Sequence, residues 1–115
     1  MTASPLTVDP TRIAVHTATS ATGCVVTVSG EVDSVTAPGL RECLLDVLGR
    51  RGSTPVEIDL AAVTFLDSAG LSALATAHRA AEAGGRTLRM RCGTTRAVVR
   101  PLEITGLWDV FTVIG

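Results

Sequence analysis

The chain has 115 residues, a formal net charge of −1 and 46 % hydrophobic residues, which fits one globular domain whose core needs no cross-links. The near-neutral charge argues against a nucleic-acid partner, because such partners are held by clustered basic side chains. No run of about 18 apolar residues and no signal-peptide pattern is present, so we expect a cytoplasmic protein without a membrane segment.

The three cysteines, Cys24, Cys43 and Cys92, lie far apart and show no metal-ligand spacing. We therefore expect no bound metal and no cofactor. Each cysteine lies in an apolar stretch, where a free thiol is typically a small buried hydrophobe. Unpaired thiols also suit a reducing compartment.

Residues 1–10 contain two prolines among small polar residues and are predicted to be a loose tail. Residues 13–18 and 24–29 then alternate between apolar and polar side chains, which predicts a β-hairpin. The segment 30–33 breaks this alternation. We expect it to form a turn or a distorted strand end.

Apolar residues recur at helical spacing from Leu40 to Leu48, which predicts an amphipathic helix. Thr36 is its expected N-cap, Pro38 fits its first turn and Gly49 fits its exit. Residues 56–60 alternate again and predict a strand, from which residues 61–66 lead to the next helix.

That second helix is predicted over residues 68–83 and a further strand over 87–92. A third helix is predicted from residue 94 to 105, although Pro101 favours a late start or a bend, because proline lacks the backbone donor. Residues 111–114 predict a short last strand. Strands that alternate with helices indicate an α/β fold, a mixed β-sheet with right-handed crossover helices packed against it.

The junction between strand and second helix carries the most informative residues, Asp67 and Ser68. The small residues Ala69 and Gly70 follow, so another surface can approach this turn closely. Ligands of α/β folds bind beyond the carboxyl ends of the strands, where Ser68 is expected to project into solvent.

Three interpretations of Ser68 stay open on the residues alone. Ser and Asp both favour the N-cap position of a helix, so Ser68 fits a cap. A catalytic nucleophile is disfavoured, because the nucleophile elbow requires Gly where Leu66 stands and neither His16 nor His78 is placed as a base. The third interpretation is a phosphorylation site, since a phosphate gains from a helix N-terminus.

Three separated motifs stand in order along the chain. The motif Asp-Ser-x-Gly-Leu is found at residues 67–71, after an apolar strand. The motif Gly-Glu-(Leu/Val/Ile)-Asp is found at 30–33 and is followed by Thr-Ala at 36–37. A third motif consists of Arg100, Leu102, Gly-Leu at 106–107 and Phe111. Together these motifs resemble the STAS domains of bacterial anti-sigma factor antagonists. The resemblance covers residues 12–114, so we divide the chain into a tail over 1–10 and a STAS domain over 11–115.

The resemblance implies the STAS fold and a regulatory role rather than an enzymatic one. Antagonists of this family bind an anti-sigma factor that is also a serine kinase, which releases a sigma factor. The kinase phosphorylates the motif serine, the phosphorylated antagonist dissociates, and a metal-dependent serine phosphatase restores it. Matched by motif, Ser68 is the phosphate acceptor and Asp33 is the acidic residue beside it. The implied partner-binding residues are Asp33, Thr36, Asp67, Ser68, Ala69 and Gly70.

The motifs leave one alternative open, a STAS domain that does not switch and acts as a scaffold or as a subunit of a larger regulatory assembly. Asp33 also fits a simple turn cap. Residue 69 is Ala where some family members have Ser or Thr, which leaves Ser68 as the only hydroxyl between Asp67 and Leu71. The phosphate-binding patterns GxxxxGK[ST] and GxGxxG are absent from the sequence. We expect the protein to be a monomer when alone.

Overall fold

The computed structural model describes residues 12–50 and 54–114, and the expected tail over 1–10 lies outside these residues. Two strands are followed by alternating helices and strands, in the order that the sequence predicts. The elements are β1 (Ile13–Ser20), β2 (Gly23–Val32), α1 (Ala37–Gly49), β3 (Val56–Leu66), α2 (Ser68–Ala83), β4 (Leu88–Arg91), α3 (Arg96–Thr105), the 3-10 helix η1 (Leu107–Asp109) and β5 (Val113–Ile114).

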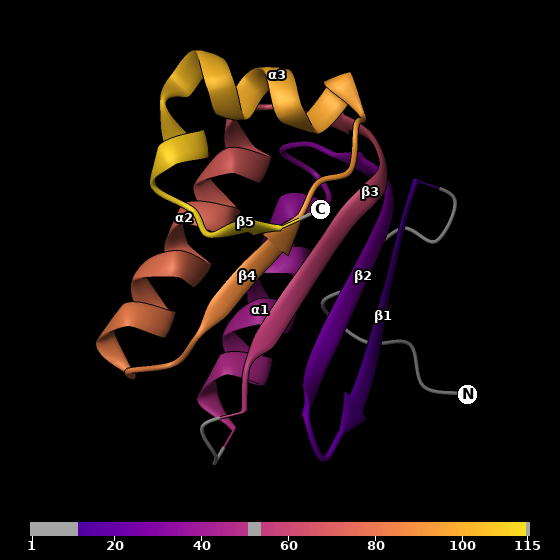
Figure 1. Ribbon diagram of the computed structural model, residues 1–115. Coiled ribbons are helices and arrows are strands. Elements are labelled where there is room, and N and C mark those ends of the chain that lie inside the picture. The colour runs from indigo at the N-terminus through magenta and orange to yellow at the C-terminus, as the bar shows by residue number, and fades with distance from the viewer. Residues whose placement is uncertain (1–11, 51–53, 115) are drawn as a thin grey trace, which may run out of the picture.

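The five strands form one sheet in the order β1-β2-β3-β4-β5. The pair β1–β2 is antiparallel, whereas the pairs β2–β3, β3–β4 and β4–β5 are parallel. The expected α/β fold with a mixed sheet and crossover helices is therefore confirmed. The carboxyl ends of the parallel strands meet at one edge, at the top of Figure 1, which we call the carboxyl edge.

Helices α1 and α2 lie side by side against one face of the sheet, and α3 lies across the carboxyl edge (Figure 1). The core between sheet and helices is mainly aliphatic, because the chain has few aromatic residues. Its fully buried side chains include Val26, Leu40, Leu44, Ile58, Leu60 and Leu74. Cys24 and Cys92 are buried as predicted, and Cys43 is half-buried. Burial raises the pKa of the Cys92 thiol to about 11, which keeps this thiol neutral.

Three strands extend further than the sequence predicts, β1 by two residues as far as Ser20 and the other two by more. β2 continues through Gly30 to Val32, and its pairing with β3 shifts register between Thr27 and Ser29 and again between Gly30 and Glu31. β3 continues from the predicted residues 56–60 as far as Leu66. The register shifts explain the lost alternation, because a bulge changes which sheet face the following side chains occupy.

Helix α3 begins at Arg96, later than the predicted residue 94, and ends before Gly106 as predicted. The expected late start is observed, although Pro101 still lies inside the helix. Within the described residues, no helix is both long and apolar enough to cross a membrane.

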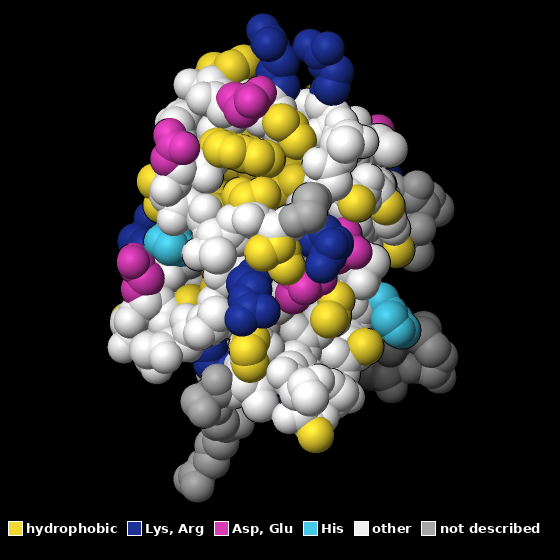
Figure 2. All heavy atoms as spheres, viewed as in Figure 1, with side chains coloured by type: hydrophobic (Ala, Val, Ile, Leu, Met, Phe, Trp, Pro, Cys, Tyr) yellow, Lys and Arg dark blue, Asp and Glu magenta, His cyan; other side chains and the backbone are white. Residues whose placement is uncertain are grey.

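The second face of the sheet is open to solvent near the β1–β2 hairpin. Figure 2 views this face and shows charged side chains gathered at its centre. The alternation along β3 and β4 puts Glu57, Arg89 and Arg91 on this face, and Glu57 stands opposite Arg89 in the parallel register. Glu57 Oε2 accepts a hydrogen bond from Arg91 Nε at 3.0 Å. This hydrogen bond and the charge of Glu57 raise the pKa of Arg91.

Candidate functional site

The junction between β3 and α2 is built around the carboxylate of Asp67. This residue has an extended backbone, with φ −106° and ψ −170°, and is the N-cap of α2. Its Oδ1 accepts hydrogen bonds from the backbone N–H groups of Ala69 at 2.9 Å and Gly70 at 3.1 Å. Two donors that the first helical turn leaves without an intrahelical partner are thereby satisfied. Asp67 is the cap, so the interpretation of Ser68 as the cap is wrong.

Gly70 lets the first turn of α2 approach the ends of β2 and β3. A Cβ atom at this position would lie 2.4 Å from Leu66 Cδ1 and 2.8 Å from Val32 Cγ1. Val32 is fully buried, so its methyl group has little room to move. The glycine therefore fixes how closely the Ser68 backbone sits to the sheet.

Ser68 is the first residue of α2 and is exposed to solvent, as predicted. Among the described residues, no hydrogen bond to its hydroxyl is found. With the cap provided by Asp67, the Ser68 side chain has no structural partner there. Its hydroxyl is therefore available to a reagent or partner approaching from solvent.

The neighbouring junction, between β2 and α1, is built around Asp33 and Thr36. Asp33 Oδ1 accepts hydrogen bonds from the backbone N–H groups of Val35 at 2.9 Å and Thr36 at 3.1 Å. The Thr36 hydroxyl accepts from the Asp33 N–H at 2.9 Å and donates to the Glu31 carbonyl at 2.9 Å. Thr36 is the N-cap residue by position, but its side chain makes no capping hydrogen bond to α1. It braces the turn instead, and Asp33 does act as a turn cap.

Arg12 is a member of this site that the sequence interpretation missed. Its guanidinium pairs with Asp33 Oδ2, and its Nε donates to Glu31 Oε1 at 3.3 Å. The hairpin register could have indicated this contact, because Ile13 pairs with Gly30 and the residue before Ile13 therefore lies beside Glu31. Arg12 neutralises part of an otherwise acidic edge.

The two junctions are neighbours at the carboxyl edge. Val32 pairs with Leu66 in the parallel register, and the Asp67 N–H donates to the Val32 carbonyl at 3.2 Å. Asp33 and Asp67 thus occupy corresponding positions on adjacent strands, which are spaced about 4.8 Å apart. All six predicted site residues come together here, although 33 and 68 are far apart in sequence.

Their exposure divides these six residues into two groups. Thr36 is 1 % exposed and Gly70 is also buried, so they position the backbone and cannot present side chains to a partner. Ser68 is exposed, and Asp33, Asp67 and Ala69 are half-buried. Two large apolar side chains at the same edge are exposed, Val35 at 66 % and Phe65 at 48 %. They add apolar contact area beside the acidic groups.

The described residues contain no cluster of three or more His, Cys, Asp or Glu side chains able to hold a metal ion. The chemistry of the site therefore rests on a free hydroxyl, two capping carboxylates and exposed apolar surface. No histidine hydrogen-bonds to Ser68 among the described residues, as a nucleophile would require.

The profile of the STAS domain family matches residues 12–114 of the chain. The chain belongs to the STAS domain family. This STAS domain is 33 % identical over 88 residues to an anti-sigma-B factor antagonist of Staphylococcus epidermidis, covering 76 % of this chain and 80 % of the relative. It is 34 % identical over 92 residues to the anti-sigma-F factor antagonist RsfB of Mycobacterium tuberculosis, covering 79 % of this chain and 72 % of that protein.

Solved structures agree with this assignment. An anti-sigma factor antagonist from Mycobacterium paratuberculosis is similar to this STAS domain with a TM-score of 0.74 and 31 % identity, covering 97 % of this chain and 89 % of that one. Unphosphorylated SpoIIAA, also an anti-sigma factor antagonist, matches with a TM-score of 0.73 over 89 % of each chain, at 16 % identity. The second likeness shows a shared fold.

Proposed function

We propose that this STAS domain is an anti-sigma factor antagonist that binds an anti-sigma factor with serine kinase activity and releases it when Ser68 is phosphorylated. The observation that carries the proposal is the exposed Ser68 hydroxyl, which has no hydrogen bond within the described residues and is relieved of capping by Asp67. Its curated relatives include anti-sigma factor antagonists, and SpoIIAA has also been solved in a phosphorylated form.

The unmodified edge suits a protein partner. Ala69 and Gly70 leave the first turn of α2 without bulky side chains, and Val35 and Phe65 add exposed apolar surface at the same edge. Arg12 neutralises only part of the charge of Glu31, Asp33 and Asp67, so the edge stays acidic and a basic group of the anti-sigma factor is the complementary partner. Thr36 and Gly70 serve the interface by holding the two junctions in place.

Phosphate on Ser68 makes the carboxyl edge more negative and should leave the fold intact. Phosphoserine adds a charge of about −1.5 to −2 at neutral pH. At the start of α2 this charge lies next to Asp67, which is the strand-end neighbour of Asp33. The helix N-terminus stabilises such a group by about 0.3–1 kcal/mol, so folding tolerates it. A partner that covers the edge must desolvate this charge or meet it with like charge, which costs several kcal/mol.

The test is calorimetry of four forms of the chain with the cognate anti-sigma factor: native, Ser68→Ala, Ser68→Asp and phosphorylated. Native protein and Ser68→Ala should bind alike, because alanine removes only an exposed hydroxyl. Phosphorylation should weaken affinity by roughly a thousandfold, which corresponds to about 4 kcal/mol. Ser68→Asp should bind weakly, although one carboxylate imitates a phosphate imperfectly.

Thr22→Asp is the matched control, because it adds a carboxylate to an exposed hairpin residue at the opposite end of β2. It should bind like the native chain. Circular dichroism on each form checks that the fold survives. A phosphorylated chain that binds as tightly as the unmodified one would exclude the switch, and the non-switching scaffold or assembly subunit would replace it. A metal-dependent serine phosphatase should restore binding of the phosphorylated form.

A further inference from the structure

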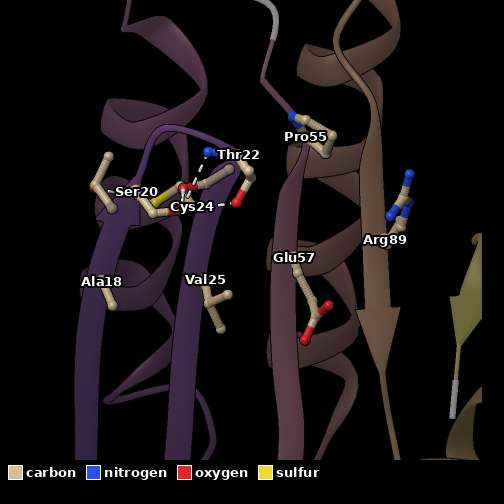
Figure 3. A pocket seen from close by; sticks show the side chains of 10 residues that line it. Ala18, Ser20, Thr22, Cys24, Val25, Pro55, Glu57 and Arg89 are labelled. Carbon is tan, nitrogen blue, oxygen red and sulfur yellow. Dashed lines mark hydrogen bonds between the residues drawn. The ribbon is translucent and has the colours of Figure 1, made fainter.

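A pocket of about 330 Å³ lies at the end of the sheet opposite the Ser68 edge, where the β1–β2 hairpin meets the start of β3. Figure 3 shows it from close by, with Ala18 and Val25 on β1 and β2, and Glu57 and Arg89 on β3 and β4. Its volume lies within the roughly 300–1,000 Å³ that is common for small-molecule sites. The switch proposed for Ser68 does not use it.

The strand register arranges these four side chains in one row across the open sheet face. Ala18 pairs with Val25, Val25 pairs with Glu57, and Glu57 pairs with Arg89. Three spacings between strands make this row about 14 Å long. One end of the row is apolar and the other end is charged, so an elongated ligand with one polar end can lie along it.

The charges in the row leave one cation without a partner. Glu57 stands opposite Arg89, but its carboxylate pairs with Arg91 at 3.0 Å instead. Within the described residues, no ion pair is found for Arg89. Arg91 takes up the Glu57 carboxylate and also stands opposite Asp59, so the guanidinium of Arg89 is the group in the pocket that is open to an anion. A guanidinium binds carboxylates in a bidentate manner, which favours an anionic group at this end.

The remaining walls fit the apolar end of the ligand. Pro55 forms the side of the pocket at the start of β3, and the turn closes it beyond Ala18. The hydroxyls of Ser20 and Thr22 at this turn are 3.0 Å apart and bond to each other. Ser20 Oγ also accepts the Thr22 N–H at 3.3 Å. These hydroxyls are thus already engaged in holding the turn.

We propose that this pocket binds a small amphiphilic carboxylate, with its carboxylate on Arg89 and its apolar chain over Val25 and Ala18. A cationic ligand is disfavoured, because the only carboxylate in the pocket is held by Arg91. A phosphate dianion is disfavoured as well, because it would face one free guanidinium beside the Glu57 carboxylate. The ligand class is therefore a monocarboxylate with a chain shorter than the row.

The test is titration of the 15N-labelled full chain with octanoate, followed by 1H–15N NMR. We expect saturable shifts at the amides of Val25, Glu57 and Arg89. Arg89→Gln should weaken binding by about tenfold or more, since a charged hydrogen bond contributes at least about 1.4 kcal/mol. Octanamide, which has the same chain without the charge, should show the same loss with the native protein.

Arg79→Gln is the matched control, because it removes an exposed arginine of α2, which lies against the other face of the sheet. It should bind octanoate like the native chain. Equal affinity of Arg89→Gln and the native chain would overturn the proposal. So would equal binding of octanamide, an equal loss in Arg79→Gln, shifts that gather away from the pocket, or no saturable shift. Circular dichroism excludes unfolding of each variant.

Discussion

The two strand-to-helix junctions at the carboxyl edge are both capped by an aspartate, but they differ in the exposure of the nearby hydroxyl. In each, an aspartate follows a strand, and its Oδ1 accepts two backbone N–H groups of the next turn. At the first junction the hydroxyl, on Thr36, is buried and holds the turn together. At the second junction the hydroxyl, on Ser68, is exposed.

This difference separates a structural hydroxyl from one that is available for modification. Thr36 and Asp33 form a closed network with Glu31 and Arg12. At the second junction, Asp67 satisfies the helix by itself, and the chain turns so that Ser68 faces solvent. Because the capping aspartate accepts the N–H groups of the first turn, the side chain of the residue after it is not needed to stabilise the helix start.

The largest expected effect comes from closing the space beneath the second junction. Gly70→Ala places a methyl group 2.8 Å from the buried Val32 Cγ1. We expect the free energy of unfolding to fall by about 2–3 kcal/mol, the cost typical of an overpacked site. Urea unfolding measures it. Gly49→Ala is the control, since no atom lies within 4 Å of the added Cβ, and its change should stay within about 1 kcal/mol. Equal changes in both variants would refute the close approach of α2.

The hydroxyls themselves give the most direct test of the comparison. Thr36→Val keeps the side-chain shape but leaves the Asp33 N–H and the Glu31 carbonyl without this partner. Unfolding free energy should fall by about 2 kcal/mol. Ser68→Ala should change it by less than about 0.5 kcal/mol, because the side chain is exposed. Urea unfolding of both variants in parallel measures the two changes. A comparable loss of unfolding free energy in Ser68→Ala would show that Ser68 is structural.

Removing the cap of α2 should have a smaller effect. Asp67→Ala loses two hydrogen bonds to the first turn and should destabilise the chain by about 1 kcal/mol. Asp67→Asn keeps a capping oxygen and should recover most of that loss. Thermal unfolding of the two variants measures the difference. If alanine and asparagine behave alike, the capping hydrogen bonds contribute nothing measurable.

The sequence predicts much of the fold because hydrophobic periodicity is local. The pattern from Leu40 to Leu48 marks α1, and the alternation after Val56 marks the start of β3. The end of β3 was not predicted as strand, because Ala61, Ala62 and Phe65 break the alternation and are exposed. Their strand conformation depends on register shifts against β2, and these are set by pairing between distant residues.

In the candidate site, too, local sequence patterns predict some features, whereas others depend on contacts between distant residues. The motif at 67–71 indicates a helix start with an exposed serine, but it does not say which residue caps the helix, because Asp and Ser both favour that position. The structure identifies Asp67 as the cap, because its backbone is extended and its carboxylate accepts the Gly70 N–H. The pairing of Arg12 with Asp33 and the pocket at Arg89 depend on contacts between strands that are distant in the sequence, and no local motif marks these contacts.

The position of Ser68 as the first helical residue has a consequence for how freely this site can change in evolution. Proline is favoured at that position, since its missing N–H has no intrahelical acceptor there, and the extended Asp67 before it suits a following proline. A chain carrying Ser68→Pro should therefore fold normally and still be unable to receive a phosphate. Selection for folding then places almost no constraint on residue 68, whereas residues 67 and 70 remain constrained. A serine retained at this position among homologues would therefore be retained for a reason other than folding.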